Sequence, residues 1–330
     1  MTVSDYEEAS SPKHKSPKVQ CRPLIGHQAK ITSASLHLDL KTIYSTSSDN
    51  SIRIWDFEQC SLLSTKMIGT RDRDGVMTGL RTSSRHVACT TDTGTLLLLD
   101  INNLLDQPQR CRISKQRLGK CSFSADELRI ALPSSDKTTY IYDVKTNVIV
   151  QRLQAHTSNV TCATFCNDNR YCLTTSLDKT CLYWDLRFVK GTVAQITLPY
   201  PALAVSCCKN GLIAVSGMSR RVRIYDLALS TPLWMCRALG AWPTTLHSSE
   251  SEWVYSSADF DSIGEINTLT GELKILCSVE LEAVFDMRLS GSDTLRIIGL
   301  PHEEELRSYR WAAPSQSYYH VISLHSSNYN

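Results

Sequence analysis

Long hydrophobic runs are missing from this chain of 330 residues, and so is an excess of charge of either sign. No apolar segment approaches the roughly 18 residues that a membrane-spanning helix needs, and the N-terminus lacks the apolar core of a secretory signal. The formal net charge is +2 at pH 7, from 35 basic and 33 acidic residues. This balance points to neither a nucleic-acid partner nor a membrane partner.

Glycine-rich loops and catalytic motifs are also missing. The chain has only 14 glycines, and those at Gly191, Gly211 and Gly217 are isolated, so no glycine-rich loop is available to surround a phosphate. No Gly-x-Ser-x-Gly nucleophile motif occurs. We therefore expect no enzyme activity and no cofactor.

Cysteine is plentiful, but its spacing does not match that of a zinc site. None of the 13 cysteines forms the paired spacing of a zinc site. Cys162, Cys172 and Cys181 fall in three successive strand-like runs, which is typical of buried free thiols in a reducing compartment. We expect no metal site and a location inside the cell, in the cytoplasm, the nucleus or both.

One polar pattern is present twice, at identical spacing. In both copies the step from His to Asp is 22 residues and the step from Asp to Trp is 6, with a Ser two residues before the Asp. The first copy consists of His27, Ser47, Asp49 and Trp55, and the second of His156, Ser176, Asp178 and Trp184. A glycine or alanine precedes each His, and an Asp follows each Trp.

This pattern resembles the WD-repeat family, whose repeating unit is one blade of a β-propeller. The resemblance implies a buried network in which the turn Asp accepts from the His, and the Ser bridges the His to the indole N–H of the Trp. Each group would cost about 1–3 kcal/mol if it were buried alone. The resemblance therefore implies that His27 and His156 are structural residues, neither catalytic nor metal-binding.

Short strand-like runs separated by turn residues recur from residue 18 onward. They divide into seven sets, so the predicted fold is all-β, a seven-bladed β-propeller of four-stranded antiparallel blades. We predict a disordered tail over 1–17, the propeller over 18–313, and a C-terminal extension over 314–330 with one strand-like run. Blades five to seven lose parts of the pattern, and the seventh is recognised only from the rhythm of AVFDMRL, TLRIIGL and ELRSYRW.

Two segments compete to complete the last blade. KVQCRPLI (18–25) lies directly before the first repeat and is placed to close the ring with an N-terminal strand. SYYHVISL (317–324) is also strand-like, and it is either the fourth strand of the last blade or an extension packed against the side. We expect the N-terminal closure.

The resemblance also implies a role and a binding face. WD-repeat propellers mostly act as rigid platforms that hold a partner on the top face near the central channel. The residues that the family pattern and the strand alignment place there are Lys30, Thr32, Ser48, Met77, Asn159, Thr161, Leu177, Trp242, Thr244 and Phe285. For Trp242 and Phe285, packing between blades is the alternative. We expect a non-catalytic scaffold or adaptor subunit bound to other protein subunits, with no membrane, direct nucleic-acid or homo-oligomer partner.

A second hypothesis rests on Trp184, Asp185 and Arg187, which resemble the Trp-Asp-x-Arg box of WD-repeat substrate receptors. Those receptors dock on the propeller adaptor of cullin-4 ubiquitin ligases, and the same residues also fit a plain blade end.

In the N-terminal tail, Ser11 and Ser16 each precede a Pro and are candidate proline-directed phosphorylation sites. A solvated linker is the alternative for both.

Overall fold

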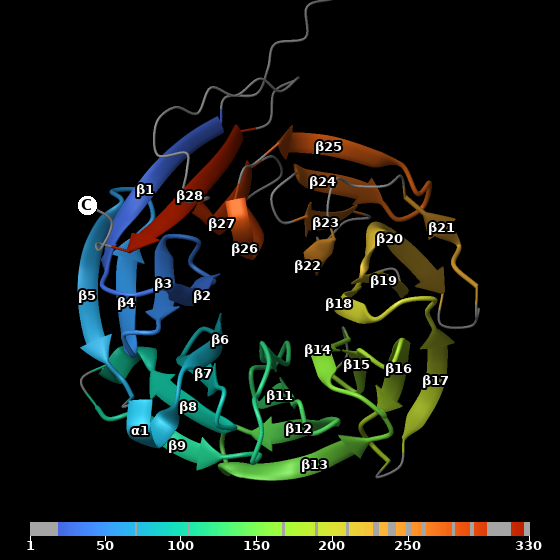
Figure 1. Cartoon of the computed structure of the whole chain (residues 1–330), viewed down its shortest axis with the longest axis horizontal. Helices are drawn as coiled ribbons and strands as arrows, with labels where there is room; N and C mark the ends of the chain where they lie inside the picture. The colour runs from blue at the N-terminus through green and yellow to red at the C-terminus, as the bar shows by residue number, and fades with distance from the viewer. Residues whose placement is uncertain are drawn as a thin grey trace, which may run out of the picture.

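Short runs of alternating apolar and polar residues form the strands of this protein. The computed structural model describes residues 19–69, 71–104, 106–166, 169–188, 191–208, 211–226, 231–236, 242–248, 253–258, 262–278, 281–290, 294–301 and 318–326. Within these ranges the strands form seven four-stranded sheets, set as blades around a central axis (Figure 1). The fold is a seven-bladed β-propeller, as the sequence predicts.

Six blades each use four consecutive antiparallel strands, with the strand nearest the axis first. Blades 1 and 2 consist of β2 (Ile31–Leu36), β3 (Thr42–Ser47), β4 (Ser51–Asp56) and β5 (Ser61–Met67), then β6 (Met77–Thr82), β7 (His86–Thr91), β8 (Thr95–Asp100) and β9 (Gln109–Arg112). Blades 3 and 4 consist of β10 (Ser122–Phe123), β11 (Arg129–Pro133), β12 (Thr138–Asp143) and β13 (Val148–Gln154), then β14 (Val160–Phe165), β15 (Tyr171–Ser176), β16 (Thr180–Asp185) and β17 (Thr192–Thr197). Blades 5 and 6 consist of β18 (Ala202–Cys207), β19 (Leu212–Gly217), β20 (Ser219–Asp226) and β21 (Trp234–Met235), then β22 (Pro243–Ser248), β23 (Trp253–Ala258), β24 (Ser262–Asn267) and β25 (Leu273–Ser278). A one-turn helix, α1 (Arg71–Asp74), precedes blade 2, and a 3-10 turn, η1 (Ile101–Asn103), follows β8.

The last blade joins the two ends of the chain. Its order is β26 (Leu281–Ser290), β27 (Thr294–Pro301), β28 (Tyr318–Ser326) and, outermost, β1 (Val19–His27) (Figure 1). Both competing segments are therefore strands of this blade, the C-terminal one third and the N-terminal one fourth. The β27–β28 and β28–β1 pairs are parallel, so this blade is mixed where an antiparallel one was predicted.

The predicted boundary at residues 313/314 is also corrected, because β28 pairs with β27 inside the propeller sheet. The segment ELRSYRW, predicted as a strand of the same blade, lies outside the described residues.

The two faces of the ring follow from the direction of the inner strands. We call the face where each inner strand begins the top face, and the face where it ends the bottom face. The loop before an inner strand and the turn between the second and third strands meet at the top face. In blade 1 the Ser48 amide donates to the Lys30 carbonyl at 2.8 Å, and in blade 4 the Leu177 amide donates to the Asn159 carbonyl at 3.0 Å.

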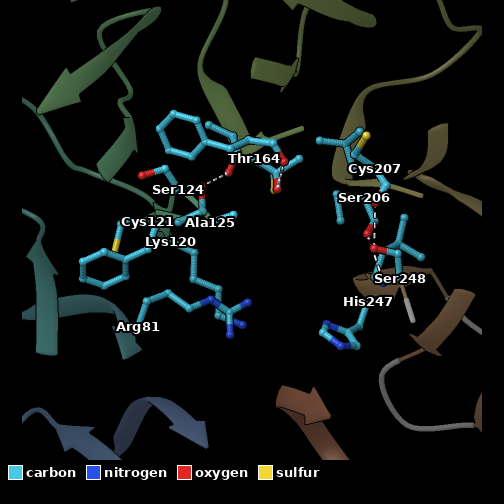
Figure 2. A pocket seen from close by; sticks show the side chains of 18 of the residues that line it. Arg81, Lys120, Cys121, Ser124, Ala125, Thr164, Ser206, Cys207, His247 and Ser248 are labelled. Atoms are coloured by element: carbon cyan, nitrogen blue, oxygen red, sulfur yellow. Dashed lines mark hydrogen bonds between the residues drawn. The ribbon is translucent and has the colours of Figure 1, made fainter. Parts of the chain in front are cut away.

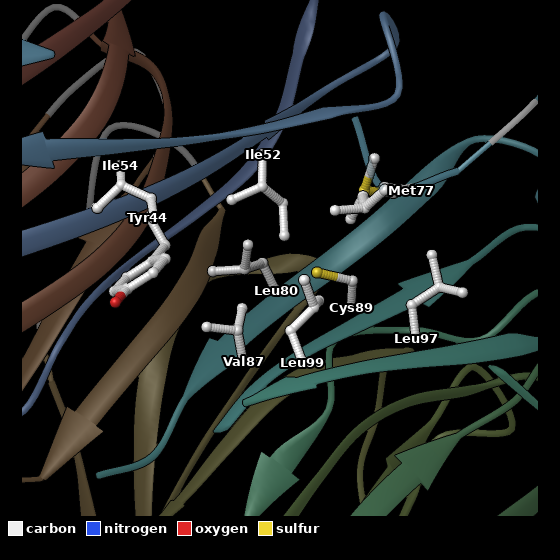
Figure 3. Packing of buried hydrophobic residues seen from close by; sticks show 10 residues of the cluster. Tyr44, Ile52, Ile54, Met77, Leu80, Val87, Cys89, Leu97 and Leu99 are labelled. Atoms are coloured by element: carbon white, nitrogen blue, oxygen red, sulfur yellow. The ribbon is translucent and has the colours of Figure 1, made fainter. Parts of the chain in front are cut away.

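The hydrophobic core lies between adjacent blades. Between blades 1 and 2, Tyr44 and Ile52 pack against Leu80 and Val87 (Figure 3). Burial of apolar surface contributes about 25 cal/mol per Å², so each interface between blades stabilises the ring. The polar groups of the blades are held within this apolar frame.

Candidate functional site

In blade 1, four buried or half-buried polar side chains form one hydrogen-bonded chain, which we call a tetrad. The Nδ1–H of His27 donates to Asp49 Oδ2 at 3.2 Å. Its Nε2 accepts from the Ser45 hydroxyl at 2.8 Å, and the Ser45 oxygen accepts from the Trp55 indole N–H at 2.8 Å. The tetrad ties the end of β1, just before the loop into β2, to β3, to the turn after it and to β4.

Blade 4 contains a second tetrad of the same geometry. His156 Nδ1 donates to Asp178 Oδ2 at 2.9 Å. Its Nε2 accepts from the Thr174 hydroxyl at 2.8 Å, which in turn accepts from the Trp184 indole at 2.8 Å. The two tetrads explain why His, Asp and Trp keep one spacing in both repeats.

The hydroxyl in each tetrad is four residues before the Asp, which corrects the sequence prediction. Ser47 and Ser176 were expected there, but Ser45 and Thr174 hold those places. Both hydroxyl positions lie on the same face of their strand, two residues apart, and the indole bonds to the one farther from the turn. Ser47 instead donates to the Ala29 carbonyl at 2.8 Å, so it fastens the turn to the preceding loop.

Blade 3 has a variant of the tetrad in which sequence reasoning missed the part of Ser114. Ser114 stands 22 residues before Asp136, which is the His-to-Asp spacing of the tetrads. Asp136 accepts from the Ser114 hydroxyl at 2.5 Å and from the Tyr140 hydroxyl at 2.7 Å. The spacing of 22 residues, repeated within this chain, was the signal that could have identified Ser114.

Electrostatics keep the two tetrad histidines neutral. Burial lowers the pKa of His27 and of His156, and it outweighs the opposing effect of Asp49 and Asp178. Both ring nitrogens of each His are used in hydrogen bonds. Among the described side chains, no group of three His, Cys, Asp or Glu residues could hold a metal ion.

Three of the predicted contact residues are exposed at the top face. Lys30, Asn159 and Trp242 occupy the loops before β2, β14 and β22, and Trp242 is 50 % exposed. The alternative of a Trp242 packed between blades is therefore wrong. Ser48 and Leu177, in the turns of the same face, are half-buried.

Met77 does not line the top face, and the prediction that it does is wrong. Its side chain is 2 % exposed and packs in the core between blades 1 and 2. The reason is register: Met77 pairs with Thr91 as Ile31 pairs with Ser47, so it is the first residue of an inner strand. Val76, one residue earlier, holds the position of Lys30 in this blade, because its carbonyl accepts the amide of the following turn.

Phe285 is also buried, where the prediction left exposure and core packing open. It packs with Leu24 and Ile298 of its own blade and with Ile31 of blade 1. Phe285 therefore belongs to the core that joins the last blade to the first.

The three predicted threonines are half-buried, and two of them make structural hydrogen bonds. Thr161 donates to the Ala202 carbonyl of blade 5 at 2.9 Å, and Thr32 donates to the Thr46 carbonyl at 3.3 Å. Thr244 lines the central channel. Thr161 therefore links blade 4 to blade 5.

The Trp-Asp-x-Arg box lies at the bottom end of blade 4. Trp184 is buried in the tetrad, and Asp185 is buried beside Arg187. The Arg187 side chain is 52 % exposed and donates through Nε and Nη2 to the two Asp185 oxygens, at 2.9 and 2.6 Å. Its guanidinium also lies over the ring of Phe188, which is exposed.

A cavity of about 490 Å³ occupies the central channel, and sequence reasoning missed it (Figure 2). It is lined by the inner strands and by the loops that follow β2, β6 and β10, so it opens toward the bottom face. Arg81, Lys120, His247 and Arg288 line it, and Asp286 pairs with Arg81 beside it. These residues come from three strands, β6, β22 and β26, and from the loop before β10, and they show no common spacing in the sequence.

Several predicted features fall outside the described residues, among them Ser11, Ser16 and the seventh-blade run ELRSYRW. In the part of the chain that is described, no helix has the length and apolar character needed to cross a bilayer. The cysteines described there, such as Cys89, Cys172 and Cys181, are free thiols.

Comparison with known proteins finds a family model that matches two stretches of the propeller. The model of the WD domain, G-beta repeat, matches residues 18–56 and 147–185, which contain the two tetrads. These two stretches are WD repeats, as the tetrads indicate, and the chain is similar to WD-repeat proteins.

Its relatives are distant. It is 24 % identical over 170 residues to WD repeat-containing protein 37 of Xenopus tropicalis, covering 49 % of this chain and 34 % of that protein. It is 30 % identical over 132 residues to the Poly(A)+ RNA export protein of Schizosaccharomyces pombe, covering 37 % of each. It is 29 % identical over 126 residues to the cell division cycle protein cdt2 of the same yeast, covering 33 % of this chain and 26 % of that protein. The chain thus spans about a third of the length of these relatives.

Proposed function

We propose that this protein is a non-catalytic WD-repeat platform that holds protein partners on its top face as a subunit of a larger assembly. The observation that carries the proposal is Trp242. A large apolar side chain stands 50 % exposed at the start of β22, on the same face as Lys30 and Asn159.

An exposed tryptophan on a rigid ring is well suited to anchor a partner. Tryptophan is enriched among residues that dominate binding energy at protein interfaces, and its indole combines a large apolar area with one polar group. A closed propeller loses little conformational freedom on binding, so more of the contact energy is retained as affinity. Lys30 and Asn159, exposed on the same face, offer polar groups of the kind found at the rim of an interface.

The test is affinity purification of the tagged full chain from cells, followed by quantitative mass spectrometry. Trp242→Ala is expected to reduce recovery of the partner by tenfold or more, since anchor residues contribute about 2 kcal/mol or more. Trp234→Ala is the matched control, because Trp234 is 42 % exposed on the outer strand of blade 5. Equal recovery with both variants, or a chain that purifies without any partner in mild salt, would contradict the proposal.

A second candidate function is that of a substrate receptor for a cullin-4 ubiquitin ligase. Arg187 favours it, because its guanidinium is half exposed and is held in place by Asp185 beside the exposed ring of Phe188. An oriented cation at the bottom face can contact an acidic adaptor surface.

Pull-down of the cullin-4 adaptor separates the two functions. Arg187→Ala should abolish adaptor recovery if the receptor function is correct. Arg85→Ala is the control, because Arg85 is an exposed arginine in the loop after β6 on the same face. An adaptor that never co-purifies with the unaltered chain would eliminate this candidate.

We also place the protein in the cytoplasm or nucleus. The free thiols of the described cysteines support this location, because such thiols persist in reducing compartments.

A further inference from the structure

The cavity in the central channel has the size of a small-molecule site and an unusual charge. Its volume of about 490 Å³ falls in the range of about 300–1,000 Å³ that ligand pockets occupy. Three cations, Arg81, Lys120 and Arg288, line it. They come from inner strands β6 and β26 and from the loop before β10.

The carboxylate of Asp286 only partly balances these cations. Its Oδ1 accepts from Arg81 Nη1 at 2.7 Å, and its Oδ2 lies 3.6 Å from Arg288 Nε. Oδ2 also accepts from the Ser35 hydroxyl at 3.1 Å and the Leu36 amide at 3.0 Å. Among these four described side chains, one carboxylate thus faces three cations, which leaves an excess of two positive charges.

Among the described residues, the other acid beside the cavity is Glu127, at its bottom mouth. It accepts from the backbone amide and the hydroxyl of Ser84, at 2.9 and 2.5 Å. Even with Glu127 counted, the described side chains leave the cavity with a positive charge. The side chains of Arg81 and Arg288 are only 24 % and 18 % exposed, so water compensates that charge incompletely.

The charges of the cluster keep Asp286 ionised. Burial alone would raise the pKa of Asp286, but Arg81 and Arg288 outweigh it and hold that pKa well below its usual range. The carboxylate therefore fixes Arg81 in place without removing the excess charge.

Neutral donors complete the lining. His247 faces Arg81 across the cavity, and the side chains of Thr164 and Ser206 surround the same space (Figure 2). Burial lowers the pKa of His247 to about 4, and Asp286 offsets only part of that effect. A neutral imidazole and hydroxyls can each donate a hydrogen bond to an anion without adding to the charge repulsion.

We propose that the channel cavity binds phosphate, either as an inorganic anion or as the phosphate group of a small organic molecule. Guanidinium groups match phosphate oxygens in a fork geometry, and an ammonium group adds a point charge. An anion of charge near two would neutralise the excess left by Asp286. The inference does not depend on the proposed platform function, because the cavity opens on the face opposite Trp242.

The test is isothermal titration calorimetry on the full chain in a buffer free of phosphate. The titrants are inorganic phosphate, pyrophosphate and glucose 6-phosphate, with citrate as a carboxylate of comparable charge. Arg288→Gln is the first variant, because Asp286 keeps its bond to Arg81 in it, and Lys120→Gln is the second. Arg117→Gln is the matched control, since Arg117 is exposed in a top-face loop and its loss changes the net charge equally.

We expect saturable binding of at least one phosphate compound to the unaltered chain. Both site variants should weaken it at least about tenfold, as the loss of a charge-assisted hydrogen bond does, and Arg117→Gln should change it less than about twofold. Tighter binding of glucose 6-phosphate would identify an organic source, and tighter binding of phosphate or pyrophosphate an inorganic one. No saturable binding, citrate binding as tight as that of every phosphate compound, or equal weakening by Arg117→Gln overturns the proposal. Circular dichroism checks that each variant is folded. If one of the two site variants does not fold, phosphate binding by the other site variant tests the proposal.

Discussion

At the scale of single residues, stability depends on hydroxyls that sit between an imidazole and an indole. Ser45 donates to His27 and accepts from Trp55. If that hydroxyl is lost, both partners are left buried without it, and each unsatisfied group costs about 1–3 kcal/mol.

Ser45→Ala should therefore lower the free energy of unfolding by about 1–3 kcal/mol. Urea denaturation followed by tryptophan fluorescence measures this change. Ser64→Ala is the control, because Ser64 is exposed on the outer strand β5, and it should change stability by less than about 0.5 kcal/mol. If the two variants are equally stable, the tetrad assignment is wrong.

Acid should destabilise the protein, beginning near the ordinary pKa of histidine. The pKa values of His27 and His156 lie below 6.5 in the folded state, and that of His247 is about 4. The unfolded chain therefore binds protons that the folded chain does not, so stability falls as pH drops from 6.5 through these lower values. The carboxylates of Asp49 and Asp178, with pKa values below 3.8, add a loss of the same sign at lower pH.

Thermal unfolding at several pH values between about 7.5 and 4.5 checks this prediction. The midpoint should fall steadily on acidification, and His247→Gln should make the fall shallower. A midpoint that stays constant or rises would contradict the burial of neutral histidines.

The sequence carried part of this residue-level account. His27, Asp49 and Trp55 could be predicted because each is the chemically distinctive member of a repeated spacing. Ser45 could not be distinguished from Ser47, since both lie on one strand face and only the reach of the indole separates them. The channel cluster left no sequence signal, because Arg81 and Asp286 are 205 residues apart and meet only when the ring closes.

At the scale of elements, the ring depends on its last blade. β1 covers the edge of β28, which would otherwise present unpaired backbone groups. The alternation of the seven strand sets predicted the blades, and the position of residues 18–25 predicted the closing strand. The insertion of β28 between β27 and β1 was not predictable from strand rhythm, because parallel pairing leaves no turn motif in the sequence.

Removal of residues 1–25 should open the ring while it leaves His27 and the blade 1 tetrad in place. We expect a lower denaturation midpoint and self-association through the exposed edge of β28. Size-exclusion chromatography with light scattering, together with urea denaturation, measures both effects. Removal of residues 1–17 is the control, because it leaves β1 whole and should change neither. Identical behaviour of the two truncated chains would argue against closure by β1.

At the scale of the whole molecule, the two candidate surfaces lie at opposite ends of one channel. The exposed Trp242 stands on the top face, while the cationic cavity opens on the bottom face. The tetrads fasten loops and turns at the top face, so they stiffen the surface proposed to hold a protein partner. Because the inner strands connect the two faces, a rigid ring allows both surfaces to be used at the same time.

Lysine-specific cross-linking of the purified assembly, read by mass spectrometry, tests the platform most directly. Exposed lysines mark both faces: Lys30, Lys137 and Lys179 lie in top-face loops and turns, and Lys41 and Lys145 lie in bottom-face loops. We expect cross-links from the top-face lysines to the partner and none from the bottom-face pair. Partner cross-links confined to Lys41 and Lys145 would contradict it.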